Sequence, residues 1–241
     1  MKGILVAMLV FVGVSLAQDP ANILVYYDYY APTGDAVLTA LSNLWPSATV
    51  LPCSGWPGSM YTQFNDALST GTWDLVIVES WYAANTSLNW SGLATYYTNG
   101  GRLYASSWQW TGGQSVVATA MGVTAETPLM NLQPMYVWDP ASPIVDGISD
   151  WGQFDPGINV KNCAFTVGTA TPVTGWTTNP TAGQAAICVA PDGYSVISGY
   201  TPAYANQGVA IWENILQFMW SGSEPGLTPT TWGDIKTQFI R

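Results

Sequence analysis

Three polar side chains stand where buried strands of this sequence are predicted to end. Asp28 follows the apolar run 23–27, Glu79 follows the run 73–78, and Ser107 closes a later run. In open α/β sheets the ligand crevice lies at the carboxyl ends of the strands, near the point where the strand order reverses. Two carboxylates and a hydroxyl at that edge could bind a hard cation or the hydroxyl groups of a sugar. The alternative is that the carboxylates cap neighbouring helices or accept hydrogen bonds from loop N–H groups.

Aromatic side chains flank the predicted crevice. Tyr29 comes directly after the first strand, Trp108 comes directly after Ser107, and Trp110 follows two residues later. Flat aromatic rings suit the apolar faces of sugar rings. Most of the 13 tryptophans are expected in the core, because the chain has only 6 phenylalanines to fill it. Trp108 and Trp110 are the exceptions that we expect at the crevice.

The chain contains no histidine. Histidine is the usual general base for a serine or cysteine nucleophile, and it is also the commonest transition-metal ligand. The pairing of nucleophile and base that remains is Ser107 with Lys161, and nothing in their spacing supports it. The sequence therefore leaves catalytic activity open and leans against it.

Four acidic residues lie close together in the second half of the chain, at Asp139, Asp146, Asp150 and Asp155. Calcium takes roughly six to eight oxygen ligands, several of them carboxylates. The spacing does not follow the EF-hand loop, so ordinary acidic turns are the alternative. Asp146, Asp150 and Asp155 are thus the candidate calcium ligands, and no other cofactor is expected.

The charge balance restricts the partners of this protein. The chain has 5 basic and 15 acidic residues, which gives a formal net charge of −10. Nucleic acid and anionic lipid both require clustered lysine and arginine, so neither is an expected partner. A carbohydrate or another protein remains as the expected ligand, and the oligomeric state stays open.

The first residues read as a secretory signal. Lys2 precedes an apolar run from residue 4 to residue 14, and Ser15-Leu-Ala17 offers a small-x-small cleavage pattern. The run is shorter than the ~20 residues that a membrane span needs. We therefore expect a signal peptide at 1–17, one domain at 19–220, and a linker with a short tail at 221–241. The mature chain is expected to have no membrane span and to work outside the cytoplasm, in the periplasm, at the cell surface or secreted.

Three cysteines follow the predicted signal. An exported chain can keep disulfides. Cys163 and Cys188 lie in separate strand-like runs that could be neighbours, so a bridge between them is one expectation. Cys53 is then a buried free thiol.

The first half of the chain alternates strands with amphipathic helices, which predicts βαβ units and a parallel sheet. Strands are expected at 23–27, 49–51, 73–78 and 100–105. Helices are expected at 33–44, 60–68, 90–98 and 114–121. The second half is different: residues 122–160 are poorly periodic, and short strands follow near Phe165, Val173, 186–189 and 195–198. A closing helix is expected at 208–220.

Four segments resemble the class I glutamine amidotransferase-like superfamily, closest to its secreted, ThuA-like or otherwise non-amidotransferase branches. The strand at 73–79 and the passage from helix to strand at 97–103 are similar to the family's third strand and to its Gly-Gly turn. Residues 141–148 resemble a "HPI…G" segment with Ser142 at the histidine. Residues 196–203 resemble the strand that carries "FHPE". The resemblance covers about residues 22–220, and it implies a three-layer, flavodoxin-like α/β fold.

The departures from this family concern its catalytic residues. Its nucleophile elbow reads G-x-C-x-G, whereas residues 105–109 place Ser106 or Ser107 near the cysteine. The histidine and glutamate of the triad map onto Thr201 and Ala203. A thiolate mechanism needs a nucleophile, a base and an orienting carboxylate, so glutamine hydrolysis is not expected. Thr201 joins Asp28, Glu79 and the crevice aromatics as a candidate ligand-binding residue.

The sequence thus predicts a catalytically inactive, amidotransferase-like domain that binds a ligand or a partner. One alternative is a hydrolase that acts on carbohydrate through carboxylates or a bound cation in the same crevice. The other is a structural component of a cell-surface assembly.

Overall fold

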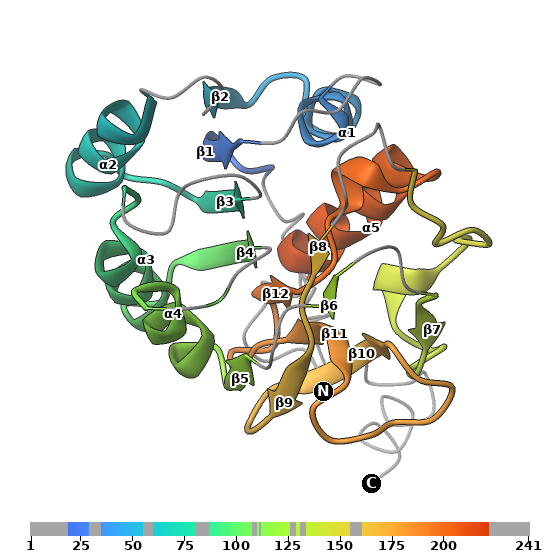
Figure 1. Cartoon of the computed structure of the whole chain (residues 1–241). Helices are drawn as coiled ribbons and strands as arrows, with labels where there is room; N and C mark the ends of the chain where they lie inside the picture. Colours follow the sequence, from blue (N-terminus) through green and yellow to red (C-terminus); the bar gives the residue numbers. More distant parts are fainter. Residues whose placement is uncertain are drawn as a thin grey trace, which may run out of the picture.

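The computed structural model of the chain describes residues 19–28, 35–54, 60–80, 87–107, 110, 112–125, 129–130, 134–154 and 161–221 (Figure 1). The predicted signal peptide and all but the first residue of the predicted tail lie outside this part. No helix among the described residues is long and apolar enough to cross a bilayer.

A mixed, largely parallel sheet lies at the centre of the molecule, in the order β2-β1-β3-β4-β12-β11-β10-β7. Its parallel strands are β2 (Thr49–Ser54), β1 (Asn22–Tyr27), β3 (Leu75–Ser80), β4 (Arg102–Ser107) and β12 (Val196–Ser198). The strand order of these five is that of flavodoxin-like folds, and the order reverses between β1 and β3. The predicted fold class is confirmed.

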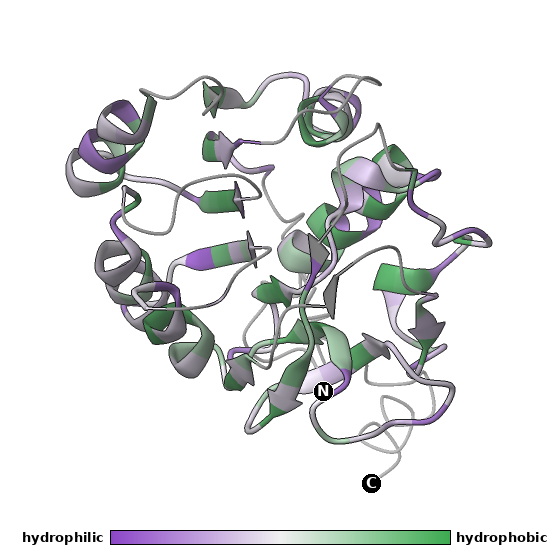
Figure 2. Cartoon of the chain, in the orientation of Figure 1, coloured by the Kyte–Doolittle hydropathy of each residue, from purple (hydrophilic) through white to green (hydrophobic). Residues whose placement is uncertain are grey.

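Five α-helices in the described part of the chain flank the sheet. They are α1 (Ala36–Leu44), α2 (Met60–Thr70), α3 (Trp90–Thr98), α4 (Gln114–Ala120) and α5 (Gly208–Ser221). Helices α1 and α5 pack on one face of the sheet, where Val25, Ile77 and Tyr104 meet Trp212, and α2, α3 and α4 cover the other face. Figure 2 shows hydrophobic residues on the central strands and on α5. Every residue of β3 is buried, so both faces of this strand are covered.

Antiparallel strands extend the sheet in the second half of the chain. They are β5 (Val123–Ala125), β7 (Tyr136–Val137), β9 (Phe165–Val167), β10 (Thr171–Gly175) and β11 (Ala185–Val189). A separate ribbon pairs β6 (Leu129–Met130) with β8 (Lys161–Asn162), and two 3₁₀ helices are η1 (Pro143–Val145) and η2 (Pro202–Tyr204). The prediction of extra short strands in this half is confirmed.

The three cysteines are buried, and none of them is joined in a disulfide in the structure. The bridge between Cys163 and Cys188 that the sequence allowed is therefore not formed here. The Cys163 N–H donates to Gly199 O at 2.7 Å, whereas Cys188 pairs with Ile197 across β11 and β12. Each cysteine thus packs as a small apolar side chain.

A thiol reagent is expected to leave the native protein unmodified and to label three thiols per chain after unfolding. Burial raises the pKa of Cys53 to about 11 and the pKa values of Cys163 and Cys188 to about 12. The reactive species is the thiolate, and burial disfavours it. Titration with Ellman's reagent, with and without guanidinium chloride, checks this; only one reactive thiol in the unfolded chain would show a bridge instead.

Candidate functional site

The central strands turn from apolar to polar at their carboxyl ends. On the face covered by α1 and α5, the register aligns Glu79 of β3 with Ser106 of β4, and Ser106 with Ser198 of β12. All three side chains are buried. The hydroxyls of Ser106 and Ser198 both donate to the carbonyl of Tyr200, at 3.3 and 2.6 Å. A row of buried polar groups therefore crosses three neighbouring strands, and we call it the Glu79 row.

A second set of polar groups lies on the opposite face of the same edge. Ser80 and Ser107 are neighbours across β3 and β4, and the side chain of Gln114 donates to Ser107 Oγ at 3.3 Å. Asp28 follows β1, and its Oδ2 accepts a hydrogen bond from the Tyr26 hydroxyl at 3.1 Å. Because alternate residues of a strand share a face, Asp28 lies on the side of Tyr26 and of α2.

Glu79 is the most perturbed acid of this edge. Burial raises its pKa to about 8; the N–H of Ala203, which donates to Oε1 at 3.4 Å, opposes the shift, and the negative charge of Asp28 adds to it. The carboxyl group is therefore mostly neutral at pH 7. Its Oε2 is buried and has no hydrogen-bond partner among the described residues.

The Tyr104 hydroxyl is fully buried beside the Glu79 row. Burial and then the nearby Glu79 raise its pKa well above the usual value, and hydrogen bonding with the side chains of Ser198 and Ser106 opposes the shift. Tyr104 thus belongs to the same buried polar cluster as these two serines. Leaving a buried polar group unpaired costs roughly 1–3 kcal/mol, so the unpaired Oε2 of Glu79 is the costly group of this cluster.

A cleft of about 390 Å³ opens beside Ala203. Ala203, which donates to the buried Glu79, forms part of its wall, together with Thr39 of α1, Phe154 and the start of α5. None of the described residues that line it carries a charge: Ala36, Thr39, Phe154, Ala203, Ala205, Asn206, Gln207, Gly208, Val209 and Ala210. We call it the carboxyl-edge cleft.

The structure separates residues that the sequence grouped together. Asp28 and Glu79 do flank the point where the strand order reverses, and the Asp28 N–H donates to Glu79 O at 3.2 Å. Their side chains, however, belong to opposite faces of the sheet, Asp28 with Ser107 and Glu79 with Ser106. The two carboxylates thus form two half-sites, and the grouping of Asp28, Glu79 and Ser107 in one crevice needs correction.

The structure describes only some of the other candidate ligand-binding residues. Thr201 is buried and precedes η2, directly beside the contact between Ala203 and Glu79. Tyr29 and Trp108 lie outside the described residues. Trp110 is 4% exposed and packs against Trp90 and Phe165, so its expected place at the crevice was wrong and it belongs to the core.

The acidic residues of the predicted calcium site serve as turn and capping groups. Asp139 accepts a hydrogen bond from the N–H of Ala141, and Asp150 accepts from the N–H of Gly152 and from Asn206. These hydrogen bonds lower the pKa of Asp150. Asp146 is exposed at the end of η1, and Asp155 lies outside the described residues. No group of three metal-ligating side chains exists within the described ranges.

Among the described residues, no basic side chain lies at this edge to activate a hydroxyl for acyl transfer. Ser107 and Ser106 are hydrogen-bonded to Gln114 and to the Tyr200 carbonyl, respectively. Arg102 lies at the opposite end of β4, where its guanidinium stacks on Trp220 at 4.0 Å. The side chain of Lys161 is outside the described part, so the structure does not test the pairing with Ser107 that the sequence left without support. The serine hydroxyls and the Gln114 amide at this edge can donate and accept hydrogen bonds, and they carry no charge.

Sequence reasoning missed several members of the site. Ser80, Ser198, Tyr104 and Gln114 were not among the candidates, although the described edge is built largely from them. A signal was present, because the strands end in Glu-Ser, Ser-Ser and Ile-Ser after purely apolar runs. At each of these endings, the side chains change from apolar ones that pack in the core to polar ones that can form hydrogen bonds.

Several solved structures are similar to this chain at low sequence identity. No protein-family model matches the sequence, and no curated protein matches it significantly. The chain is similar to the glutaminase domain of CTPS from Trypanosoma brucei, with 11% identity over 87% of this chain and 96% of that one (TM-score 0.49). A ThuA-like protein from Parabacteroides merdae has 10% identity over 88% and 94% (TM-score 0.49). A β-galactosidase from Rahnella sp. R3 matches over 84% of this chain but only 31% of its own length, with 12% identity and a TM-score of 0.49. The structural matches thus include class I glutamine amidotransferase-like and ThuA-like proteins, and at these identities they say nothing about ligand or activity.

Proposed function

We propose that this protein is a non-hydrolytic binding domain, working outside the cytoplasm, that holds an uncharged polyhydroxy ligand such as a saccharide in the carboxyl-edge cleft. The observation that carries the proposal is the described lining of this cleft, which combines polar and apolar side chains and carries no charge. Thr39, Asn206 and Gln207 belong to this lining, and their hydroxyl and amide groups both donate and accept hydrogen bonds, which matches a sugar hydroxyl. The lining without charges favours a neutral ligand over a cation or an anion.

The side chains of the cleft support binding without turnover. The positions that resemble the family's triad hold Ser107, Thr201 and Ala203. Ala203 offers only its backbone N–H, which donates to Glu79. Glycoside hydrolysis uses a pair of carboxylates that flank the bond, and the described lining of the cleft contains no carboxylate, which favours retention of a saccharide over its hydrolysis.

A saccharide titration followed by protein-observed NMR tests this function. Cellobiose, maltose and N,N′-diacetylchitobiose are the probes, and the amides of Asn206 and Gln207 report on the cleft that they border. We expect saturable shifts with at least one probe and an affinity loss of about tenfold or more in Thr39→Arg. A tenfold loss corresponds to about 1.4 kcal/mol.

Ser42→Arg provides the matched control, because Ser42 is exposed on the same helix and does not line the cleft. It adds the same charge and should bind like the wild type. Unshifted Asn206 and Gln207 amides with all three probes would overturn the proposal. Release of p-nitrophenol from neutral glycosides on addition of calcium or magnesium would replace it with the cation-assisted hydrolase.

A further inference from the structure

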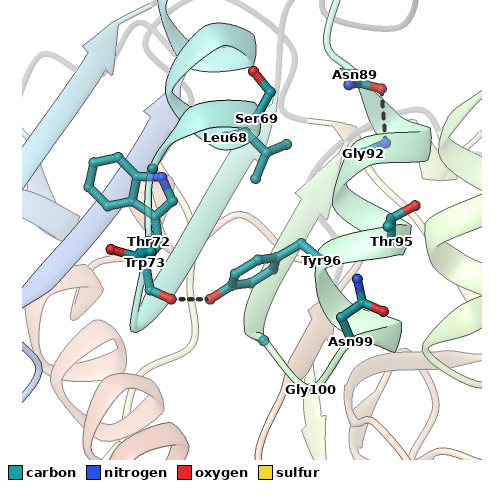
Figure 3. Close-up of a pocket in the computed structure, with 12 residues that line it drawn as sticks. Leu68, Ser69, Thr72, Trp73, Asn89, Gly92, Thr95, Tyr96, Asn99 and Gly100 are labelled. Carbon is teal, nitrogen blue, oxygen red and sulfur yellow. Dashed lines mark hydrogen bonds between the residues drawn. The ribbon is translucent and has the colours of Figure 1, made fainter.

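A second cleft lies at the opposite edge of the sheet, where the strands begin. It measures about 630 Å³ and lies between the end of α2, the start of β3, the outer side of α3 and the turn into β4 (Figure 3). We call it the amino-edge cleft. The side chains that determine what this cleft can bind are Trp73, Tyr96, Asn89, Thr95 and Asn99.

The two aromatic rings of this cleft are fixed by hydrogen bonds to backbone. The Tyr96 hydroxyl donates to the Trp73 carbonyl at 3.1 Å (Figure 3). The Trp73 indole N–H donates to Ala67 O at 2.8 Å. Since their polar atoms are already paired, the rings offer mainly their faces to a ligand. Both side chains are only half-buried.

Glycines allow these rings to lie close to the backbone. A Cβ on Gly71 would come within 2.4 Å of the Trp73 ring, and a Cβ on Gly101 within 2.4 Å of the Tyr96 ring. Each ring therefore lies over a residue without a side chain. This packing holds both rings against the walls of the cleft and keeps the space between the walls open.

The rim of the cleft is polar and uncharged. Asn89, Thr95 and Asn99 are exposed on or next to α3, and Ser69 and Thr72 stand on the facing wall. The carbonyl oxygen of the Asn89 side chain accepts from the Gly92 N–H at 2.9 Å, which orients this side chain at the start of the helix. None of the 12 lining residues is acidic or basic.

We infer that the amino-edge cleft is a second binding site, for a neutral saccharide. Aromatic faces take the apolar C–H face of a sugar ring, and amides and hydroxyls bind its hydroxyl groups. A phosphate or carboxylate ligand would find no cation in the lining, and it would meet a chain with a net charge of −10. The site is independent of the carboxyl-edge cleft, since the two lie at opposite ends of the strands.

Site-resolved NMR with the same three disaccharides tests this inference. The amides of Asn99 and Gly100 report on the amino-edge cleft, and those of Asn206 and Gln207 report on the other one. We expect saturable shifts at Asn99 and Gly100 that Thr39→Arg leaves unchanged. The two proposals can therefore fail separately.

Thr95→Arg is the blocking variant, because Thr95 is exposed on α3 and lines the cleft. It should weaken binding at this site by about tenfold or more. Ser91→Arg places the same charge on the same helix away from the lining and should bind like the wild type. Asn99→Arg blocks the cleft from its other end and replaces Thr95→Arg if that variant misfolds. Unshifted Asn99 and Gly100 amides with all three probes, or binding that survives both blocking variants, would overturn the inference.

Discussion

Replacing Glu79 with glutamine is expected to stabilise the protein above pH 8 and to flatten the pH dependence of its unfolding free energy. Burial raises the pKa of Glu79 to about 8 in the folded protein, against an ordinary value of 4.5. Between these two values the folded state holds a proton that the unfolded state has released. Stability is therefore greatest below pH 4.5 for this group, and it is lost as the pH rises through 8.

The size of this effect follows from the shift. At about 1.4 kcal/mol per pKa unit, full ionisation of Glu79 costs on the order of 5 kcal/mol. Glutamine keeps the oxygen that accepts from Ala203 and cannot ionise, so the variant should escape the loss. We expect it to exceed the wild type by this amount near pH 9.5 and by only about 1 kcal/mol near pH 5.

Urea unfolding followed by tryptophan fluorescence at pH 5, 7, 8 and 9.5 measures the difference. Asp146→Asn is the control, because Asp146 is an exposed acid whose removal should leave the curve of the wild type unchanged. If Glu79→Gln and the wild type lose stability in parallel as the pH rises, Glu79 is ionised in the folded protein at neutral pH. A charged Glu79 would weaken the case for a neutral ligand.

The first half of the fold follows from local patterns in the sequence. The sequence predicts a helix at 90–98, and α3 spans Trp90–Thr98, with Asn89 as its N-cap. The strand predicted at 73–78 instead spans Leu75–Ser80. The reason is a set of side-chain contacts: the Asp74 carboxylate accepts hydrogen bonds from the N–H groups of Ala21 and Asn22, and Trp73 bonds to α2.

For the antiparallel half, the sequence predicted that short strands are present but not how they pair. Strand β7 has two residues and β12 has three, which is too short for a period of two to show. Their pairing depends on contacts between residues distant in sequence, such as Val137 with Thr174. Tertiary contacts of this kind are not readable from a local pattern.

The candidate site was predicted in position but not in arrangement. Asp28, Glu79 and Ser107 are all buried at the carboxyl ends of their strands, as their sequence positions indicated. The face on which each one lies depends on the register between strands, and a shift of one residue reverses it. The sequence does not specify that register, so it could not show that Glu79 joins Ser106 while Asp28 joins Ser107. Their roles in ligand binding stay predictions.

Alanine at Gly199 is expected to destabilise the protein by about 3 kcal/mol, at the upper end of the range for overpacked positions. Gly199 follows β12, and a Cβ there would lie 2.1 Å from the Cys163 carbonyl oxygen. That carbonyl cannot easily move away, because it accepts from the Trp176 indole at 2.8 Å. The Gly199 backbone is also held, since its N–H donates to Ala186 O and its carbonyl accepts from the Cys163 N–H.

Gly113→Ala is the matched control for this substitution. A Cβ on Gly113 would meet the Trp90 side chain at 3.5 Å, which is an ordinary contact, and its φ of −61° suits any residue. For a domain of this size about 3 kcal/mol corresponds to a fall in Tm of roughly 6–12 °C, which calorimetry resolves. Equal Tm values for the two variants would mean that the backbone at Gly199 can shift. The strand end that carries Ser198, Tyr200 and Thr201 would then be an adaptable part of the site, rather than a rigid support for the Glu79 row.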